Sequence, residues 1–442
     1  MNISIWFKRE TWRLDNYEWG LATTSSLAVG LVTTTAWLTP FATLLFIAVP
    51  AIIVFFTNRT GGKLTRGGLT WMPFGLLAVL LVSYLVLAMT WSVDTGWAIR
   101  ALWPVLATIL VVYIASFTYR ALPLNWLTHF CRAALIAYCV CLIFGFVEET
   151  TDHALKRLLF WPFQAIGFEG GEFQVDWNHI SQVRPYRTNW NMTTFIFLIW
   201  PILIFLRTQI TVSEFRVARI LLLLVVAAMI SQSHHQAAIV ALLGGYTIFG
   251  IARLNLRIAA LLTALGWLMA FLVVVPASKI AYQNGVHLAE EYLPSSFRHR
   301  IVLWKFTSEK ITEAPLWGVG TGSTHPLNEA RKELAQKVPG TIFIFETGTH
   351  PHNIYLQTLY ELGIFGALII AGAGLVVIAS IYHMGNAMNA SYGLAAFAAW
   401  AVQSAFSFGL FEVWYVFALA FTVCLFIAVQ AHWYLAKDTN TS

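Results

Sequence analysis

Long apolar runs separated by short polar segments dominate the whole length of this 442-residue chain. A helix of about 20 apolar residues crosses the hydrocarbon core of a bilayer. We therefore predict an all-α polytopic membrane protein with about 12 transmembrane helices. The predicted spans are residues 20–39, 41–57, 70–91, 101–117, 127–147, 190–206, 217–232, 235–251, 257–276, 353–380, 392–409 and 412–432.

Lysine and arginine residues in the short connections predict the orientation of these spans. They gather before the first predicted span and then on alternate connections, which we place on the cytoplasmic side together with both termini. Two longer loops, 148–189 and 277–351, then lie on the outer face, and the second is expected to be partly helical. We expect residues 1–442 to form a single integral membrane domain.

Composition agrees with this class. Hydrophobic residues make up 58% of the chain and charged residues 11%, which excludes an ordinary soluble domain. The net charge of +6 is dispersed among short loops, so it indicates no nucleic-acid partner. All four cysteines lie in apolar runs and are interpreted as small core residues. The chain has no Asp-x-Asp pair and no His-Glu-x-x-His motif, so we expect no metal and no other cofactor.

Two histidines, His350 and His352, stand directly before the tenth predicted span, in "THPHNIYLQTLYELGIFG" (349–366). We expect Thr349 to cap this helix and Pro351 to occupy its first turn, which would place His352 inside the helix. The positive end of the helix dipole would then lower the pKa of His352 and keep the ring able to accept a proton. The alternative is a histidine that only anchors the helix at the interface.

Two stretches carry recognisable motifs. Residues 352–366 follow the pattern His-Asn, nine residues, Gly, two residues, Gly. Residues 298–322 contain Arg300, then Trp304 one helical turn later, then Pro-Leu-x-Gly-Val-Gly at 315–320. Together with the topology, these motifs resemble the O-antigen ligase and polymerase superfamily of bacterial envelope glycosyltransferases. The glycines after residue 317 follow no strand, so we interpret them as a flexible outer turn and not as a nucleotide-binding loop.

A third stretch, "RPYR" before the sixth predicted span, resembles the arginine that the family carries there, and Arg184 and Arg187 are both candidates. One departure lies between the seventh and eighth spans, where many relatives have Ser-x-Ser-Arg and this chain has "SQSHH". If that arginine binds phosphate, either His234 or His235 must replace it or the charge comes from elsewhere in the chain. The alternative is a pair of solvated histidines in a tight turn.

The resemblance implies a GT-C-like fold in the bacterial inner membrane, with an active site that faces the periplasm. It implies transfer of a glycan from an undecaprenyl-diphosphate-linked donor to lipid A–core, by an O-antigen ligase. His352 would be the catalytic base. The diphosphate would be held by Arg184, Arg187 and Arg300. The supporting residues would be Asn353, His350, His234 and Trp304.

Two other functions stay open. An O-antigen polymerase would use the same lipid-linked donor with a second lipid-linked glycan as acceptor. A membrane transporter or lipid flippase would perform no chemistry. Against the transporter, we find no carboxylates in the middle of the predicted spans, and the candidate residues gather at one membrane face.

Overall fold

The computed structural model describes residues 39–57, 71–152, 154, 173–176, 179–183, 186–233, 235–329 and 350–441. Within these ranges the chain is helical apart from one two-stranded antiparallel sheet. Its strands are β1 (Phe173–Asp176) and β2 (His179–Val183), and Phe173 pairs with Val183. The predicted all-α architecture is therefore confirmed for the described residues except for this pair of strands, which lies in the predicted loop 148–189.

Helices coincide with every predicted span from 41–57 onward. They are α2 (Thr39–Thr57), α3 (Trp71–Met89), α4 (Thr95–Ala121), α5 (Leu124–Thr150), α7 (Tyr186–Gln209), α8 (Val212–Gln232), α9 (Gln236–Leu254), α10 (Leu256–Gln283), α13 (Ile354–Tyr382), α14 (Ala387–Phe406) and α15 (Val413–Thr441). Among the described helices, 7 are long and apolar enough to cross a membrane. The first predicted span lies outside the described residues apart from its last position, so the total of about twelve stays a prediction.

Side-chain caps explain where several of these helices begin. At the start of α8, Thr211 and Glu214 form a capping box, in which each side chain accepts the other residue's backbone N–H. Asn255, Asn353 and Asn386 cap α10, α13 and α14 by accepting a backbone N–H of the first turn. Such caps satisfy N–H groups that have no partner inside the helix.

The predicted outer loop 277–351 is partly helical in the described part of the chain, as expected. Helix α10 extends seven residues past its predicted end, to Gln283. It is followed by a short 3-10 helix, η5 (Val286–Leu288), then by α11 (Ser295–Ile311) and α12 (Thr324–Glu329). The side of the membrane on which this segment lies stays a prediction.

The described residues group into two compact units. The first lies within Met1–Arg66, Leu110–Leu242 and Phe417–Ser442, where α5, α7 and α8 pack against one another. Its core includes Phe46, whose ring lies 4.4 Å from those of Phe130 and Phe421 between centroids. The buried Tyr119 hydroxyl donates to the Phe46 carbonyl at 2.5 Å, so its polar group is satisfied.

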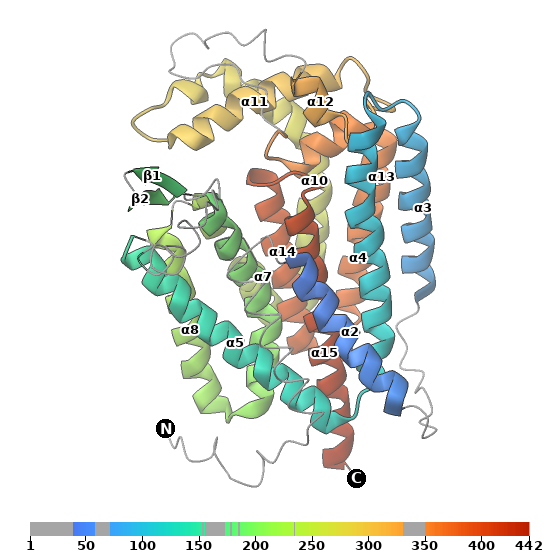
Figure 1. Ribbon diagram of the computed structural model, residues 1–442, viewed down its shortest axis with the longest axis vertical. Coiled ribbons are helices and arrows are strands. Elements are labelled where there is room, and N and C mark those ends of the chain that lie inside the picture. The colour runs from blue at the N-terminus through green and yellow to red at the C-terminus, as the bar shows by residue number, and fades with distance from the viewer. Residues whose placement is uncertain are drawn as a thin grey trace. The chain divides into compact units, whose positions relative to one another are not determined.

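The second unit lies within Gly67–Ile109 and Leu243–Val416 and contains the histidine loop. In it α10, α13 and α14 pack together, and α11 lies across one end of α10 and α13 (Figure 1). The buried Trp267 of α10 contacts Tyr355 and Phe397 with centroid distances of 5.4 Å. Its indole N–H donates to the carbonyl of Ala371 at 3.0 Å. This packing fixes the N-terminal half of α13, which carries the predicted motif.

Helix α13 is broken at Gly363, where φ is 65° and ψ is −167°. The segment after Pro315 runs against this break backbone to backbone. A Cβ at Gly363 would lie 2.2 Å from the Leu316 carbonyl oxygen, and one at Gly318 would lie 2.5 Å from that of Glu361. Both positions have positive φ, so only glycine fits this approach without strain.

Hydrogen bonds satisfy the backbone groups that the break releases. The carbonyls of Tyr360 and Glu361 accept the N–H groups of Val319 and Gly320 at 2.9 Å each. The Leu362 carbonyl accepts the hydroxyl of a tyrosine of α3 at 2.6 Å. The glycine-containing segment is thus paired with α13, and our interpretation of it as a flexible outer turn is wrong.

Candidate functional site

The loop 350–353 before α13 is held between α11 and the segment that follows α14. On α11, the buried Trp304 indole donates to the Pro351 carbonyl at 2.9 Å. The Trp304 ring also packs on Phe297 and on Phe406 at the end of α14, with centroid distances of 5.8 and 6.0 Å. The motif tryptophan therefore positions the histidine loop, and its supporting role in a reaction stays a prediction.

The helix starts later than we predicted. Asn353 is the cap, because its side-chain oxygen accepts the Leu356 N–H at 3.0 Å. Its amide also donates to the Ala405 carbonyl at 2.9 Å, which joins the loop to α14. Pro351 and His352 therefore precede the helix, and Thr349 lies outside the described residues. The prediction that His352 stands in the first turn is wrong, because Asn353, one of the residue types that cap helices best, caps α13.

His352 adopts a left-handed backbone conformation, with φ of 52°, which is rare for a residue with a side chain. Its ring Nδ1 lies 2.7 Å from the Ser407 carbonyl oxygen. A carbonyl can only accept, so Nδ1 carries the hydrogen and the neutral ring keeps its lone pair on Nε2. Burial holds the pKa of His352 well below its usual range, and the neighbouring His350 and then Arg300 lower it further. The ring is therefore neutral near pH 7.

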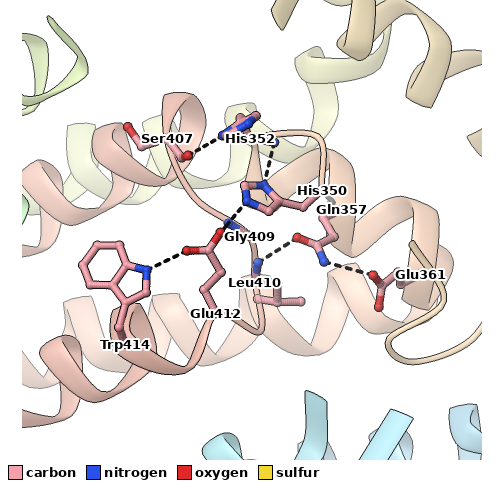
Figure 2. A network of polar contacts seen from close by, with 9 residues as sticks. All are labelled: His350, His352, Gln357, Glu361, Ser407, Gly409, Leu410, Glu412 and Trp414. Atoms are coloured by element: carbon pink, nitrogen blue, oxygen red, sulfur yellow. Dashed lines mark hydrogen bonds and ion pairs between the residues drawn. The ribbon is translucent and has the colours of Figure 1, made fainter. Parts of the chain in front are cut away.

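His350 contacts both His352 and an acidic residue that we did not predict (Figure 2). Its Nδ1 accepts the backbone N–H of His352 at 3.1 Å. Its Nε2 forms a short contact with a carboxylate oxygen of Glu412. An imidazole that accepts at Nδ1 and donates at Nε2 is the neutral Nε2–H tautomer. His350 is therefore part of a defined hydrogen-bond chain and not only an interfacial side chain.

Glu412 lies in the short connection between α14 and α15. Its second carboxylate oxygen accepts the Trp414 indole N–H at 2.7 Å (Figure 2). Burial opposes ionisation of Glu412, but the contacts with His350 and Trp414 outweigh it and lower the pKa of the carboxyl. Sequence reasoning missed this residue because we counted it as the first position of the last span. A carboxylate in "GLFEVWY", between two apolar runs, was the available signal.

Arg300 lies on α11 one turn before Trp304, so both side chains share a helical face. That face meets the histidine loop, and the Arg300 charge acts on the His352 ring. Burial lowers the pKa of Arg300. No described carboxylate forms an ion pair with it, whereas the neighbouring Arg298 pairs with Glu290 at 3.3 Å. A guanidinium placed in this way is available to an anionic ligand.

A second chain of hydrogen bonds links α13 to the segment after α14 (Figure 2) and to the start of α12. The Gln357 oxygen accepts the Leu410 N–H at 2.7 Å, and its amide donates to Glu361 at 2.9 Å. Glu361 is buried and also accepts the Gly322 N–H at 2.5 Å and the Thr324 hydroxyl. Glu361 lies inside α13, in the first third of the predicted span 353–380, so a predicted span does contain a buried carboxylate, although not at its middle. Its oxygens are occupied by protein donors, which indicates a structural connection.

The remaining predicted residues belong to the first unit or lie outside the described part of the chain. Arg184 and His234 are outside it, and Arg187 is the second residue of α7, where its side chain is not described. His235 is buried, and its Nε2 lies 3.1 Å from the Thr193 hydroxyl of α7. The alternative of a solvated histidine pair is thus wrong for His235. Among the described residues, no three His, Cys, Asp or Glu side chains gather where they could hold a metal ion.

Comparison with known proteins identifies the segment that carries the motifs. Residues 219–371 match the family described as O-Antigen ligase. A protein of Rickettsia conorii is 27% identical over 131 residues, and one of Rickettsia bellii is 26% identical over 135 residues. Both are provisionally named polysaccharide ligases. The matches cover 29% and 30% of this chain but only 31% and 33% of those proteins, so the similarity spans about a third of each relative.

The matched segment includes Arg300, Trp304 and the loop from His350 to Asn353. These are the residues on which the resemblance was based, and the structure brings them together in one unit. Residues 219–371 of this chain are therefore the segment that is similar to the O-antigen ligase family.

Proposed function

We propose that this protein is an O-antigen ligase in the bacterial inner membrane, with its site on the periplasmic face. It transfers O-antigen polysaccharide from undecaprenyl diphosphate to a sugar hydroxyl of lipid A–core. The family domain and the names of the relatives support ligase chemistry. The helices long enough to cross a membrane support a substrate that is itself anchored in the membrane.

The observation that carries the proposal is the state of the His352 ring. Its Nδ1–H is bound to the Ser407 carbonyl, so Nε2 is the atom left to accept a proton. Glycosyl transfer to a hydroxyl needs such a base. In the proposed step, the acceptor oxygen bonds to the anomeric carbon of the donor sugar, and its proton passes to Nε2 of His352. The bond from that carbon to the diphosphate oxygen breaks, and undecaprenyl diphosphate leaves with the electron pair.

The leaving diphosphate gains negative charge and needs cations aimed at its oxygens. Arg300 supplies one beside His352. We propose that Arg184 and Arg187 supply further contacts. The negative charge of a bound diphosphate would also offset the positive charge of Arg300. This would raise the pKa of His352 toward the range that suits a general base. Donor binding thus prepares the base for the step that follows.

We also propose that the reaction needs no metal ion, because the arginines would supply the positive charge that a metal ion supplies elsewhere. Transfer by purified protein should continue in excess chelator. Loss of transfer that Mg²⁺ or Mn²⁺ restores would contradict this part of the proposal.

The main test compares single variants in one ligation assay with purified lipid-linked polysaccharide and lipid A–core, at matched amounts of folded protein. His352→Ala should reduce transfer by roughly 10²–10⁴-fold, the usual loss when a general base is removed. Arg300→Ala should weaken use of the donor, and Arg300→Lys should restore only part of it because a point charge replaces a fork. Normal transfer by His352→Ala would refute the proposal.

The acceptor separates the ligase from the polymerase. A ligase joins polymer to lipid A–core, whereas a polymerase lengthens one lipid-linked glycan with another. Product that forms only between two lipid-linked glycans, in the presence of lipid A–core, would favour the polymerase. Movement of donor lipid across vesicles without either product would favour a flippase.

A further inference from the structure

The left-handed backbone of His352 needs a partner that holds it. Among the described residues other than glycine, only Asp152 and His352 have a positive φ. The N–H of His352 donates to Nδ1 of His350, and the two rings lie edge to face with centroids 4.2 Å apart. The His352 ring also reaches back to the Ser407 carbonyl. These two hydrogen bonds fix both the backbone and the ring.

The bond from the His352 backbone depends on the tautomer of His350. Nδ1 can accept only when it carries no hydrogen, so the hydrogen of the neutral ring must be on Nε2. That hydrogen points to Glu412, whose carboxylate accepts it. A carboxylate at this place favours the Nε2–H form over the other tautomer, since an acceptor has nothing to donate to a bare Nε2.

Glu412 is surrounded by donors alone. One oxygen faces Nε2 of His350 and the Gly409 N–H, which lies 3.4 Å away, and the other faces the indole N–H of Trp414 at 2.7 Å. The carboxylate can accept all three bonds. Its own partners hold it in one orientation, and the space is tight, because a Cβ at Gly409 would lie 3.0 Å from Cγ of His350.

We propose that Glu412 is a positioning residue of the transferase, which selects the tautomer of His350 and thereby holds His352 in its left-handed, proton-accepting conformation. This inference rests on the proposed function, because it assigns the role through His352. Glu412 lies outside the segment that matches the family, and in this proposal it acts on His352 through His350 and does not contact the substrate.

Glu412→Gln tests the idea because the amide has one oxygen in place of two. If its NH2 group faces His350, the His350 hydrogen must move to Nδ1 and the His352 N–H loses its acceptor. If the NH2 group faces Trp414, two donors meet. Trp414→Phe removes the second donor, so in the double variant the glutamine oxygen can turn to His350 and restore the original tautomer.

We expect Glu412→Gln to lower kcat by roughly ten- to a hundredfold, with little change in the KM for donor, because a buried donor loses its partner. Trp414→Phe is the matched control and should lose much less kcat than Glu412→Gln, because Glu412 keeps its contacts with His350 and the Gly409 N–H. The double variant should recover most of the lost kcat. A double variant as slow as Glu412→Gln, or slower, would overturn the proposal, since charge or packing would then be what matters.

A second pair of variants tests the same inference should Glu412→Gln fail to fold. His350→Asn keeps an acceptor oxygen at the place of Nδ1, whereas His350→Leu has none, so His350→Asn should transfer at least about fivefold faster. Equal rates would overturn the proposal. His352→Ala, measured in the same assay, keeps the two failures apart. If it is active, the proposed function and this inference fall together. If it is inactive and Glu412→Gln is normal, only the inference falls.

Discussion

Asn353 combines two tasks that substitution can separate, since its oxygen caps α13 and its amide ties the loop to Ala405. In Asn353→Ala both are lost. A cap is worth about 0.5–2 kcal/mol and a hydrogen bond about 0.5–1.5 kcal/mol. The free energy of unfolding should therefore fall by about 1–3.5 kcal/mol.

Asn353→Asp keeps the cap, because a carboxylate accepts the Leu356 N–H and suits the positive end of the helix. It replaces the amide by an oxygen that faces the Ala405 carbonyl, a distance of 2.9 Å in the native pair. We therefore expect Asn353→Asp to retain more stability than Asn353→Ala and yet to lose transfer, because the histidine loop is released from α14.

Asn386→Ala is the matched control. Asn386 caps α14 with two backbone N–H groups, at 2.9 and 3.0 Å, and makes no described contact with the histidine loop. It should lose about 0.5–2 kcal/mol of stability and keep its turnover. Stability would be measured by thermal unfolding in detergent, and turnover by ligation per folded molecule. The reasoning is refuted if Asn353→Asp ligates normally, or if Asn386→Ala loses as much turnover as Asn353→Ala.

Three further predictions concern the break in α13, the pH dependence and the topology. Gly363→Ala should lower the free energy of unfolding by about 2–6 kcal/mol, because φ is positive there and the new Cβ overlaps Leu316. Gly372→Ala in the same helix, where a Cβ meets nothing within 4 Å, should be neutral or stabilising in thermal unfolding. Equal melting temperatures of the two variants would contradict this. Because neutral His352 is the active form and its pKa is lowered, kcat/KM should hold as pH falls through the usual histidine range near about 6.5 and decline only below it. A pH–rate profile with its midpoint in that range would count against the assignment. Cysteines at Tyr292 and Leu254, which are 81% and 90% exposed, should react with an impermeant maleimide from the periplasmic and the cytoplasmic side respectively, and reaction of both from one side would overturn the predicted orientation.

The positions of the helices could be predicted because each long apolar run has one favourable structure in a membrane, a helix that satisfies its own backbone. That Arg300 and Trp304 share a helical face could also be predicted, because the two residues lie four positions apart on a helix. Other features of the site are tertiary. The conformation of His352 depends on His350, and the partner of His350 comes from residue 412, distant along the chain. No local pattern in the sequence indicates that pairing.

The break in α13 at Gly363 could not be predicted from the sequence either, although this glycine belongs to the motif at 352–366. Glycine indicates that a backbone passes close by but not which one. The backbone that lies there is the segment after Pro315.

The pairing of that segment with the break in α13 bears on how this chain and its relatives can be recombined. The two stretches exchange backbone hydrogen bonds and approach one another through glycines on both sides. A chimera that takes only one stretch from a relative would join two backbones whose spacing was never adjusted to each other. Residues 315–366 contain both stretches and should therefore be exchanged as one block, so that the two backbones keep the spacing at which they pair.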